Sequence, residues 1–319
     1  MHKINKFNLN QFTKYFRIIL RVKMKILIIG GSGVIGYNLI QYLIKRNNVH
    51  YTFLQNSISE PNGHCLDITN KASTIELIKK IRPDVIIHTA ALTNVERCEK
   101  EKEFTYSINV EGTENIVEGA KLVKSKIVYV STSAVFSGNK DEYFEDDKVD
   151  PISNYGLTKA EAEKIVMNSG LRYMILRTDQ PYYWNKKWQH TNSVLRVLDT
   201  LRSDKTFKEI TDWYNAPTYV PDFVKATARL LELEETGIFH LVGSDFVSRF
   251  DWALLTCDIF GLDSKKIQKI DSNKLNLMAK RSNVKLDNRK ITEKTGILFL
   301  GIQEGLNNMK KQEQSKNNV

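Results

Sequence analysis

The sequence predicts an α/β fold, a doubly wound parallel sheet followed by a smaller C-terminal lobe. From Lys25 onward, short apolar runs alternate with segments whose apolar residues recur at helical spacing. Strands that read as continuous apolar runs are buried on both faces, which is typical of parallel sheets covered by helices. The chain has 319 residues, 41% hydrophobic and 26% charged, which is enough for one large domain or two small ones and excludes a mostly disordered chain.

The first half of the chain supplies this sheet by alternating strands and helices. Arg82-Pro83 is expected to end the second helix, because the residue before a proline disfavours helical backbone, and Thr69 or Asn70 is its expected cap. Strands are expected at 25–29, 51–54, 85–88 and 126–130, and helices at 34–46, 69–81 and 104–123.

The second half is aromatic and irregular after Arg177, with helices expected near 192–202, 222–234 and 250–260. This pattern suggests a lobe interleaved with the last strands. We expect the part beyond Lys310, which is polar, to be disordered. The chain therefore divides into a basic leader at 1–23, the sheet domain at 24–178, the lobe at 179–305 and a polar tail at 306–319.

The net charge of +10 is concentrated at the start of the chain. Residues 1–23 contain six basic and no acidic residues, which leaves 41 basic against 37 acidic residues in the remainder. A nucleic-acid-binding protein would need a basic face on its folded part, and no basic run appears after residue 23. We therefore expect no nucleic-acid partner. We interpret 1–23 as a disordered leader or an upstream start before Met24, with an amphipathic membrane-surface segment as the alternative.

Cysteine and hydropathy patterns indicate a cytoplasmic protein. Cys65, Cys98 and Cys257 are too widely spaced for a C-x-x-C metal site and form no plausible disulfide framework. No apolar stretch approaches the roughly 20 residues that cross a bilayer, so we expect no stable membrane insertion. The histidines are scattered, and no metal site is expected.

Three glycines follow the first strand directly and open a helix, in the spacing G-x-x-G-x-x-G. Glycine permits a tight turn, close approach to a pyrophosphate, and packing of the helix on the sheet. The helix N-terminus adds free N–H groups and a positive dipole end. The strand, turn and helix context therefore predicts a dinucleotide phosphate site at Gly30, Ser32, Gly33, Val34, Ile35 and Gly36.

The residues after the second strand indicate which dinucleotide binds there. A classical NAD site has an acidic residue at this position for the ribose 2′-hydroxyl, whereas here the segment 54–57 includes Asn56 and no acid. NADP(H) is therefore favoured, and NAD(H) remains the alternative. Asp67, beside Ile68, could accept a hydrogen bond from the adenine amino group or could cap the following helix.

Y-x-x-x-K occurs three times, starting at Tyr155, Tyr182 and Tyr183, so context must select among the three. Only Tyr155 begins a segment of good helical periodicity, where four-residue spacing places it on one face with Lys159. A hydroxyl-rich strand end that includes Thr132 lies upstream. A nearby ammonium would lower the tyrosine pKa from near 10, and the threonine hydroxyl would hold a substrate carbonyl beside it. This set predicts proton transfer coupled to hydride transfer.

Together these motifs resemble the extended short-chain dehydrogenase/reductase family, and most closely its dTDP-4-dehydrorhamnose reductases. The resemblance covers residues 24–300. Besides the glycines and the Tyr155-Lys159 pair, it rests on Arg82 to Ile86, His88 to Ala91, Val130 to Thr132, Val135 to Gly138, Leu176 to Thr178 and Ala216 to Thr218. It implies a Rossmann-like sheet domain.

The resemblance also implies roles for individual residues. The catalytic residues would be Thr132, Tyr155 and Lys159. The cofactor would be lined by Ala90, Ala91, Tyr155, Lys159 and Thr178. The substrate would contact Thr132, Ser133, Trp188 and Asn192. The implied reaction is NAD(P)H-dependent reduction of a nucleotide-linked 4-keto-6-deoxy sugar. A nucleotide-sugar epimerase, and a non-catalytic regulatory subunit like that of methionine adenosyltransferase, remain alternatives, and a homodimer remains open.

The chain departs from the family at two adjacent positions of the site. Ser133-Ala134 stand where these reductases carry an Asp-Tyr pair and where 4,6-dehydratases carry Asp-Glu. The missing acids argue against dehydratase activity. The same Ser-Ala context resembles epimerases, so that alternative stays open.

Overall fold

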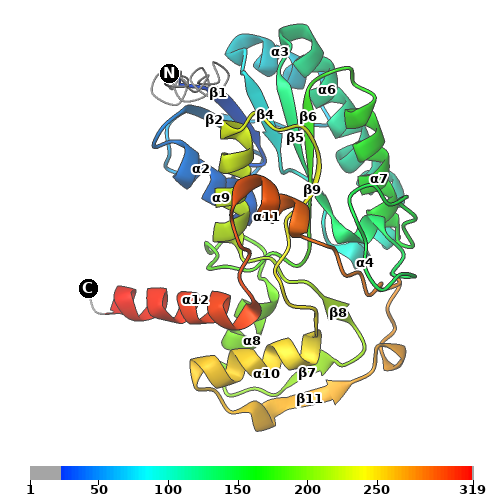
Figure 1. Cartoon of the computed structure of the whole chain (residues 1–319), viewed down its shortest axis with the longest axis vertical. Helices are drawn as coiled ribbons and strands as arrows, with labels where there is room; N and C mark the ends of the chain where they lie inside the picture. Colours follow the sequence, from blue (N-terminus) through cyan, green and yellow to red (C-terminus); the bar gives the residue numbers. More distant parts are fainter. Residues whose placement is uncertain (1–22, 318–319) are drawn as a thin grey trace, which may run out of the picture.

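The computed structural model describes residues 23–317 (Figure 1). A sheet covered by helices forms the upper part of Figure 1, and a smaller lobe lies below it. Except for Lys23, the predicted basic leader at 1–23 lies outside the described residues, as do the last two residues of the polar tail.

Seven parallel strands form the central sheet in the order β3-β2-β1-β4-β5-β6-β9, which confirms the predicted fold class. The chain runs outward from β1 to β3 and then returns to build the other half from β4 onward. This reversal places the loops after β1 and β4 side by side, where sheets of this kind bind ligands. The strands are β1 (Lys25–Ile29), β2 (Asn48–Phe53), β3 (Gly63–Cys65), β4 (Val85–His88), β5 (Lys126–Thr132), β6 (Tyr173–Thr178) and β9 (Gly237–His240).

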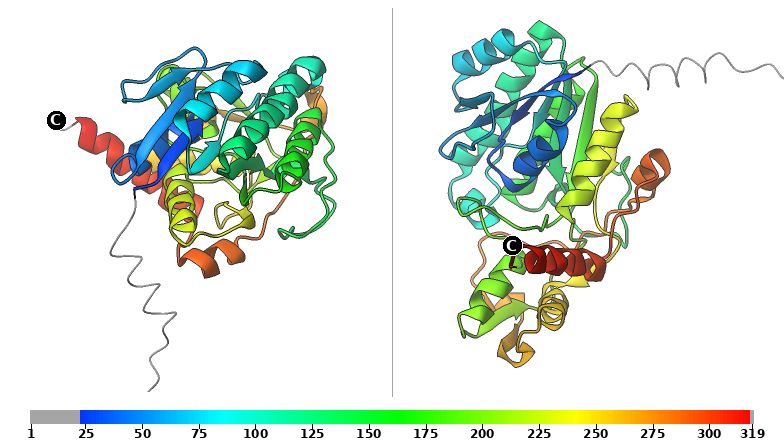
Figure 2. Two further views of the ribbon diagram at one scale, coloured as in Figure 1. Left: turned by 90° about the horizontal axis from the view of Figure 1, so that it is seen from above. Right: turned by 90° about the vertical axis from the view of Figure 1, so that its left-hand side faces the viewer.

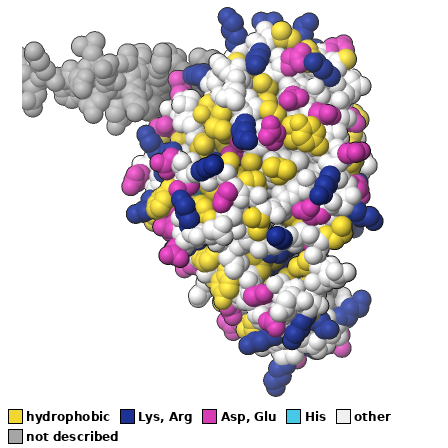
Figure 3. All heavy atoms as spheres, turned by 90° about the vertical axis from the view of Figure 1, so that its right-hand side faces the viewer, with side chains coloured by type: hydrophobic (Ala, Val, Ile, Leu, Met, Phe, Trp, Pro, Cys, Tyr) yellow, Lys and Arg dark blue, Asp and Glu magenta, His cyan; other side chains and the backbone are white. Residues whose placement is uncertain are grey.

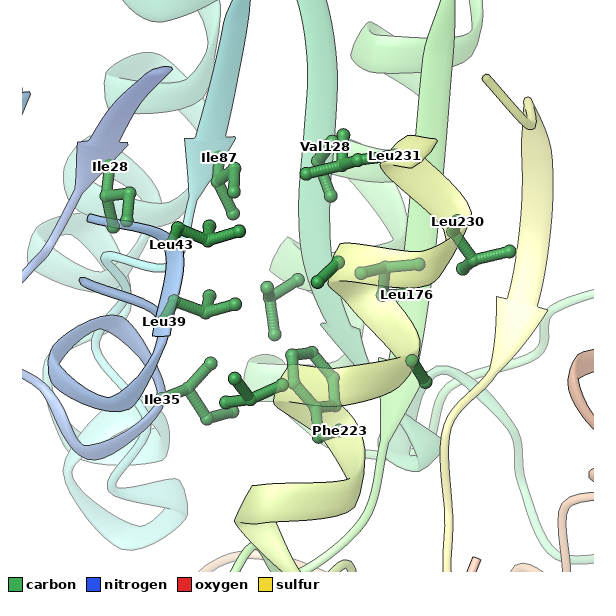
Figure 4. Packing of buried hydrophobic residues seen from close by; sticks show 14 of the residues in the cluster. Ile28, Ile35, Leu39, Leu43, Ile87, Val128, Leu176, Phe223, Leu230 and Leu231 are labelled. Atoms are coloured by element: carbon green, nitrogen blue, oxygen red, sulfur yellow. The ribbon is translucent and has the colours of Figure 1, made fainter. Parts of the chain in front are cut away.

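Helices cover both faces of the sheet, as two views show (Figures 1 and 2). Alternate residues of β1 enter two separate cores: Ile26 and Ile28 pack with α2 and α9, whereas Leu27 and Ile29 pack on the opposite face. Figure 4 shows the first core, where Phe223 of α9 lies near Ile35 and Leu39 of α2. Burial on both faces explains why the strands read as continuous apolar runs. The covering helices are α2 (Val34–Leu43) and α9 (Val220–Glu232) on one face, and α3 (Lys71–Ile81), α6 (Gly112–Val123) and α7 (Asn154–Met167) on the other.

The helix predicted at 104–123 is divided in the structure. A π-helical segment, η1 (Ser107–Glu111), joins the short α5 (Lys102–Tyr106) to α6, and α4 (Val95–Lys100) precedes them without having been predicted. Periodicity alone does not distinguish a π-helical turn from an α-helical one. Such turns are frequent at functional sites, and this one carries a buried asparagine, Asn109.

The lobe is built after β6 and is interleaved with α9 and β9 of the main sheet. Two small sheets and the helices packed against them enclose its own cores. Its elements are α8 (Ser193–Arg202), β7 (Phe207–Ile210), β8 (Tyr214–Asn215), β10 (Val247–Ser248), α10 (Arg249–Phe260), η3 (Ser264–Lys266), β11 (Ile267–Ile270) and η4 (Ser272–Lys274). The chain returns toward α9 with α11 (Arg289–Thr295).

The disorder predicted beyond Lys310 is wrong for the described residues of that segment, because helix α12 (Ile302–Asn317) continues through them. Ile302, Leu306 and Met309 recur at helical spacing and are at most 1% exposed in the lobe core. Their burial fixes the helix despite its polar outer face. Within residues 23–317, no helix combines the length and apolar character that a membrane span requires.

Candidate active site

The glycine loop lies between β1 and the start of α2. Gly33 caps α2 without a side-chain hydrogen bond, so the first N–H groups of the helix are left for another acceptor. A side chain at Gly36 would place its Cβ 2.4 Å from the carbonyl oxygen of Gly30. Only glycine therefore lets α2 pack this closely on the loop. Backbone donors at a helix N-terminus and space for a close ligand match the needs of a pyrophosphate.

The ends of β2 and β4 hold this loop in place. Thr52 accepts a hydrogen bond from the Gly30 N–H at 3.1 Å. From the other side, the Thr89 hydroxyl donates to Ile29 and Gly30 carbonyls at 2.8 and 3.1 Å. Ala90 and Ala91, which follow Thr89, are half-buried beside the loop. The predicted phosphate and cofactor residues are thus brought together.

The residues expected near the adenosine part lie farther along the same edge. Asn56 is exposed in the loop after β2. Asp67 is exposed, and its carboxylate accepts bonds from the Thr69 N–H and hydroxyl at 2.9 and 2.7 Å. Asn70, not Asp67, caps α3. Ile68 is buried against Gly112 of α6.

Thr132 and Tyr155 meet where β5 ends and α7 begins. Thr132 is the last residue of β5, and its hydroxyl accepts a bond from the Ala134 N–H at 3.2 Å in the short turn η2 (Ser133–Val135). Thr132 lies beside the Tyr155 phenol, where its side chain lowers the Tyr155 pKa. Gly156 permits this approach, because a Cβ there would lie 2.1 Å from the Ala134 carbonyl oxygen.

Lys159 lies one helical turn after Tyr155 and is 3% exposed. Its ammonium donates to the Val130 carbonyl at 2.7 Å and lies 4.0 Å from the centre of the Tyr129 ring. Burial lowers the pKa of Lys159 to about 7, although the Glu163 carboxylate opposes that shift.

The prediction that Lys159 lowers the pKa of Tyr155 is wrong for this structure. Burial raises the pKa of Tyr155 above its usual value, and the Thr132 side chain only partly opposes the effect. The tyrosine is consequently held as a neutral phenol, which is a proton donor rather than a base.

Asn109 is a site residue that sequence reasoning missed. It is 1% exposed in the π-helical segment η1, where its side chain exchanges hydrogen bonds with the Leu92 N–H and carbonyl at 2.8 and 3.1 Å. Its amide also donates to the Thr158 hydroxyl on α7 at 3.1 Å. It therefore joins the loop after β4 to the helix of Tyr155. In the sequence, the only sign of this role is that a polar residue stands between the apolar Ile108 and Val110.

The ends of β5 and β6 bring two further predicted residues together. Thr178 is paired in register with Thr132, and its hydroxyl donates to Thr218 at 2.9 Å. One residue after the end of each strand, the Ser133 hydroxyl donates to the Asp179 carboxylate at 2.9 Å.

The two lobe residues expected to contact substrate have structural partners. Asn192 caps α8 by accepting from Leu195 N–H at 3.2 Å, and its amide donates to the Tyr183 carbonyl at 2.6 Å. Trp188 is 39% exposed, and its indole donates to the Ser32 carbonyl at 3.3 Å. Trp188 therefore lies against the glycine loop. No group of three or more metal-binding side chains is found within the described residues.

The site can be compared with those of known proteins. By sequence, dTDP-4-dehydrorhamnose reductase of Aggregatibacter actinomycetemcomitans is 33% identical over 241 residues, which cover 73% of this chain and 78% of that protein. Methionine adenosyltransferase 2 subunit beta of Xenopus tropicalis is 28% identical over 292 residues, covering 88% and 86%. By structure, a dTDP-4-dehydrorhamnose reductase from Bacillus anthracis in complex with NADP is similar with a TM-score of 0.81 at 25% identity, covering 91% of this chain and 100% of that one.

A family model, described as RmlD substrate binding domain, matches residues 24–315. The match spans the glycine loop, the hydroxyl and tyrosine pair, and the lobe. The chain therefore belongs to the RmlD substrate binding domain family.

Proposed function

We propose that this protein is an NADP(H)-dependent reductase of a nucleotide-linked 4-keto-6-deoxy sugar. The observation that carries the proposal is the placement of Thr132, at the end of β5, beside Tyr155, one helical turn before the buried Lys159. Relatives named dTDP-4-dehydrorhamnose reductase support the substrate class.

The glycine loop and the start of α2 would hold the cofactor pyrophosphate, since no side chain caps the first N–H groups of the helix. The exposed Asn56 and the absence of an acid at 54–57 suit a 2′-phosphate better than a bare 2′-hydroxyl. A reductase relative in complex with NADP supports this choice. NADPH, when bound, supplies hydride to the carbonyl carbon.

The chain's own residues supply the proton and hold the ketone. The Thr132 hydroxyl would orient the substrate carbonyl beside Tyr155, and the phenol would donate its proton to the oxygen as negative charge develops there. In its charged form, the Lys159 ammonium would donate to and hold the cofactor ribose. This general acid step contributes about 10² to 10⁴ in rate in enzymes that use one.

The test of the proposal is NADPH absorbance with purified protein and dTDP-, UDP- and GDP-linked 4-keto-6-deoxy sugars, with NADH as comparison. The reductase predicts oxidation of NADPH by one of these sugars. An epimerase predicts sugar interconversion without net cofactor oxidation.

A regulatory subunit is the alternative with direct support, because the relative named methionine adenosyltransferase 2 subunit beta matches more of this chain, 88% against 73%. It predicts tight NADP(H) binding, no turnover with any sugar of the panel, and binding to a methionine adenosyltransferase. The first two outcomes together would overturn the reductase.

We also propose that the protein works in the cytoplasm as a homodimer. Within the described part, all three cysteines are unpaired, which suits a reducing compartment.

Figure 3 views the side of α6 and α7, where hydrophobic side chains lie among charged ones. Four large apolar side chains of α5, α6 and α7 are 46–57% exposed: Phe104, Tyr106, Leu122 and Leu157. Light scattering after size exclusion would show twice the chain mass of 36.8 kDa, and a monomer would refute the dimer.

A further inference from the structure

Beside the catalytic pair, one wall of the site contains a carboxylate that the proposed proton transfer does not use. Asp179 follows β6 directly, is 6% exposed, and lies one residue beyond Thr178, the register partner of Thr132. The lobe holds it from the other side, since the Ala216 N–H donates to its second oxygen at 2.8 Å. Asp179 therefore bridges the sheet edge and the lobe at the candidate site.

The carboxylate dictates the direction of the hydrogen bond that it makes with Ser133. Burial raises the pKa of Asp179 to about 6, so the group is ionised at pH 7.5 and only accepts hydrogen bonds. A hydroxyl has one proton, and the Ser133 proton is committed to Asp179 at 2.9 Å. The remaining lone pairs of the Ser133 oxygen can therefore only accept.

A second acceptor lies in the same wall. The Asn215 side chain lies beside Asp179 and lowers the pKa of that carboxyl, and because a carboxylate cannot donate, the amide nitrogen of Asn215 must face it. The Asn215 carbonyl oxygen is buried and has no hydrogen-bond partner within the described part of the chain. A buried acceptor without a donor is unusual in folded proteins.

The backbone next to Asp179 is held in an uncommon conformation. Gln180 has a φ of +36°, in the left-handed region that non-glycine residues rarely adopt. Its side-chain oxygen accepts a bond at 3.0 Å from Arg249, which is 6% exposed at the start of α10. Strained residues persist where the surroundings over-determine them, often at ligand sites. The carboxylate is therefore fixed in place rather than adaptable.

From this geometry we infer that Asp179 is a positioning residue that makes the Ser133 wall acceptor-only, so that the site selects a sugar with a free hydroxyl next to the reacting carbonyl. The inference rests on the proposed sugar-nucleotide site. A hydroxyl donates into this wall, whereas a fluorine in its place can only accept and leaves the Ser133 oxygen unpaired, which is what gives polar sites their selectivity.

The test measures binding rather than turnover. Calorimetry with saturating NADP⁺ would give Kd for a dTDP-linked 4-keto-6-deoxyhexose and for its 3-deoxy-3-fluoro analogue, whose fluorine can accept but not donate. For the unaltered protein we expect the hydroxyl-bearing sugar to bind about 10-fold more tightly, the size of one good hydrogen bond. Equal affinity, or no binding of either sugar, would overturn the inference. NADPH oxidation by the same protein tests the proposed reductase separately, so the two can fail independently.

Asp179→Asn is the informative variant. Its single carbonyl oxygen is claimed by the Ala216 N–H, so its amide would donate to Ser133, whose proton would then turn toward the site. Ser133 would then donate to the hydroxyl or to the fluorine, so the ratio of the two Kd values should fall toward 1, and retention of the 10-fold ratio would refute the role of Asp179.

Two further variants separate positioning from folding. Asp150→Asn is the matched control, because Asp150 likewise accepts a serine hydroxyl and a backbone N–H, both from Ser137, outside the wall. It should keep the ratio. Ser133→Ala removes the acceptor itself without disturbing the Ala216 bond. If Asp179→Asn does not fold, Ser133→Ala decides: a ratio near 1 supports the inference, and an unchanged ratio contradicts it.

Discussion

Gly156→Ala tests whether the close approach of α7 to the turn after β5 positions the proton donor. The added Cβ would lie 2.1 Å from the Ala134 carbonyl oxygen, about 1.3 Å short of ordinary contact at 3.4 Å. The obstacle is backbone and cannot rotate away, so α7 or the turn must move by about 1 Å. That movement separates Tyr155 from Thr132.

Stability and activity should respond differently to this change. Alanine is better than glycine in a helix by about 1 kcal/mol, whereas overpacking costs about 1 to 3 kcal/mol, so the free energy of unfolding should fall by no more than about 2 kcal/mol. A 1 Å misplacement of a reacting group can cost about 100-fold in rate. We therefore expect kcat/KM to fall by about 100-fold in a protein that remains folded.

The assay combines steady-state NADPH oxidation with urea denaturation. Gly119→Ala is the matched control, because its Cβ would meet the Ile78 side chain at 2.8 Å on α3, away from the site. It should lower stability and leave kcat/KM unchanged. If Gly156→Ala kept kcat/KM within about twofold of the original, the positioning argument would be wrong.

Two further predictions concern stability. Burial lowers the pKa values of His88 and His240 to about 3, whereas both would titrate near 6.5 when unfolded. The unfolded chain thus binds more protons below pH 6.5, and the free energy of unfolding should fall by about 2 kcal/mol for each histidine between pH 7.5 and pH 5. Urea titrations at both pH values would check this, and His88→Gln should reduce the pH dependence by about half; an undiminished dependence would contradict the assignment. Leu306→Ala, at a fully buried position of α12, should cost about 2 to 5 kcal/mol. The exposed Leu298→Ala serves as control, and equal losses in the two variants would contradict packing of α12 on the lobe.

The sheet and its helices could be predicted because their signals are local. Apolar runs such as 25–29 are buried on both faces, and the glycine spacing after them suits one strand, turn and helix unit. The helix at the end of the chain was missed for the opposite reason. The composition beyond Lys310 is polar and therefore predicted disorder. The apolar residues that hold the helix, Ile302, Leu306 and Met309, are few and stand among polar neighbours.

The catalytic set could be proposed from context, but its electrostatics could not. Tyr155 and Lys159 share a helix, so their spacing is visible in the sequence. Burial is not visible there, and it is burial that lowers the Lys159 pKa and raises that of Tyr155. The Ser133 and Asp179 pair was missed because it depends on β5 and β6 being neighbours, which is a property of the sheet order.

The proton donor is tested most directly by Tyr155→Phe, which removes the phenol and leaves the ring. Single-turnover oxidation of bound NADPH by a saturating 4-keto-6-deoxy sugar nucleotide should slow by at least about 100-fold. Tyr183→Phe, from another Y-x-x-x-K segment of the chain, should leave the rate unchanged. A Tyr155→Phe protein that oxidised NADPH at the original rate would contradict the proposed mechanism.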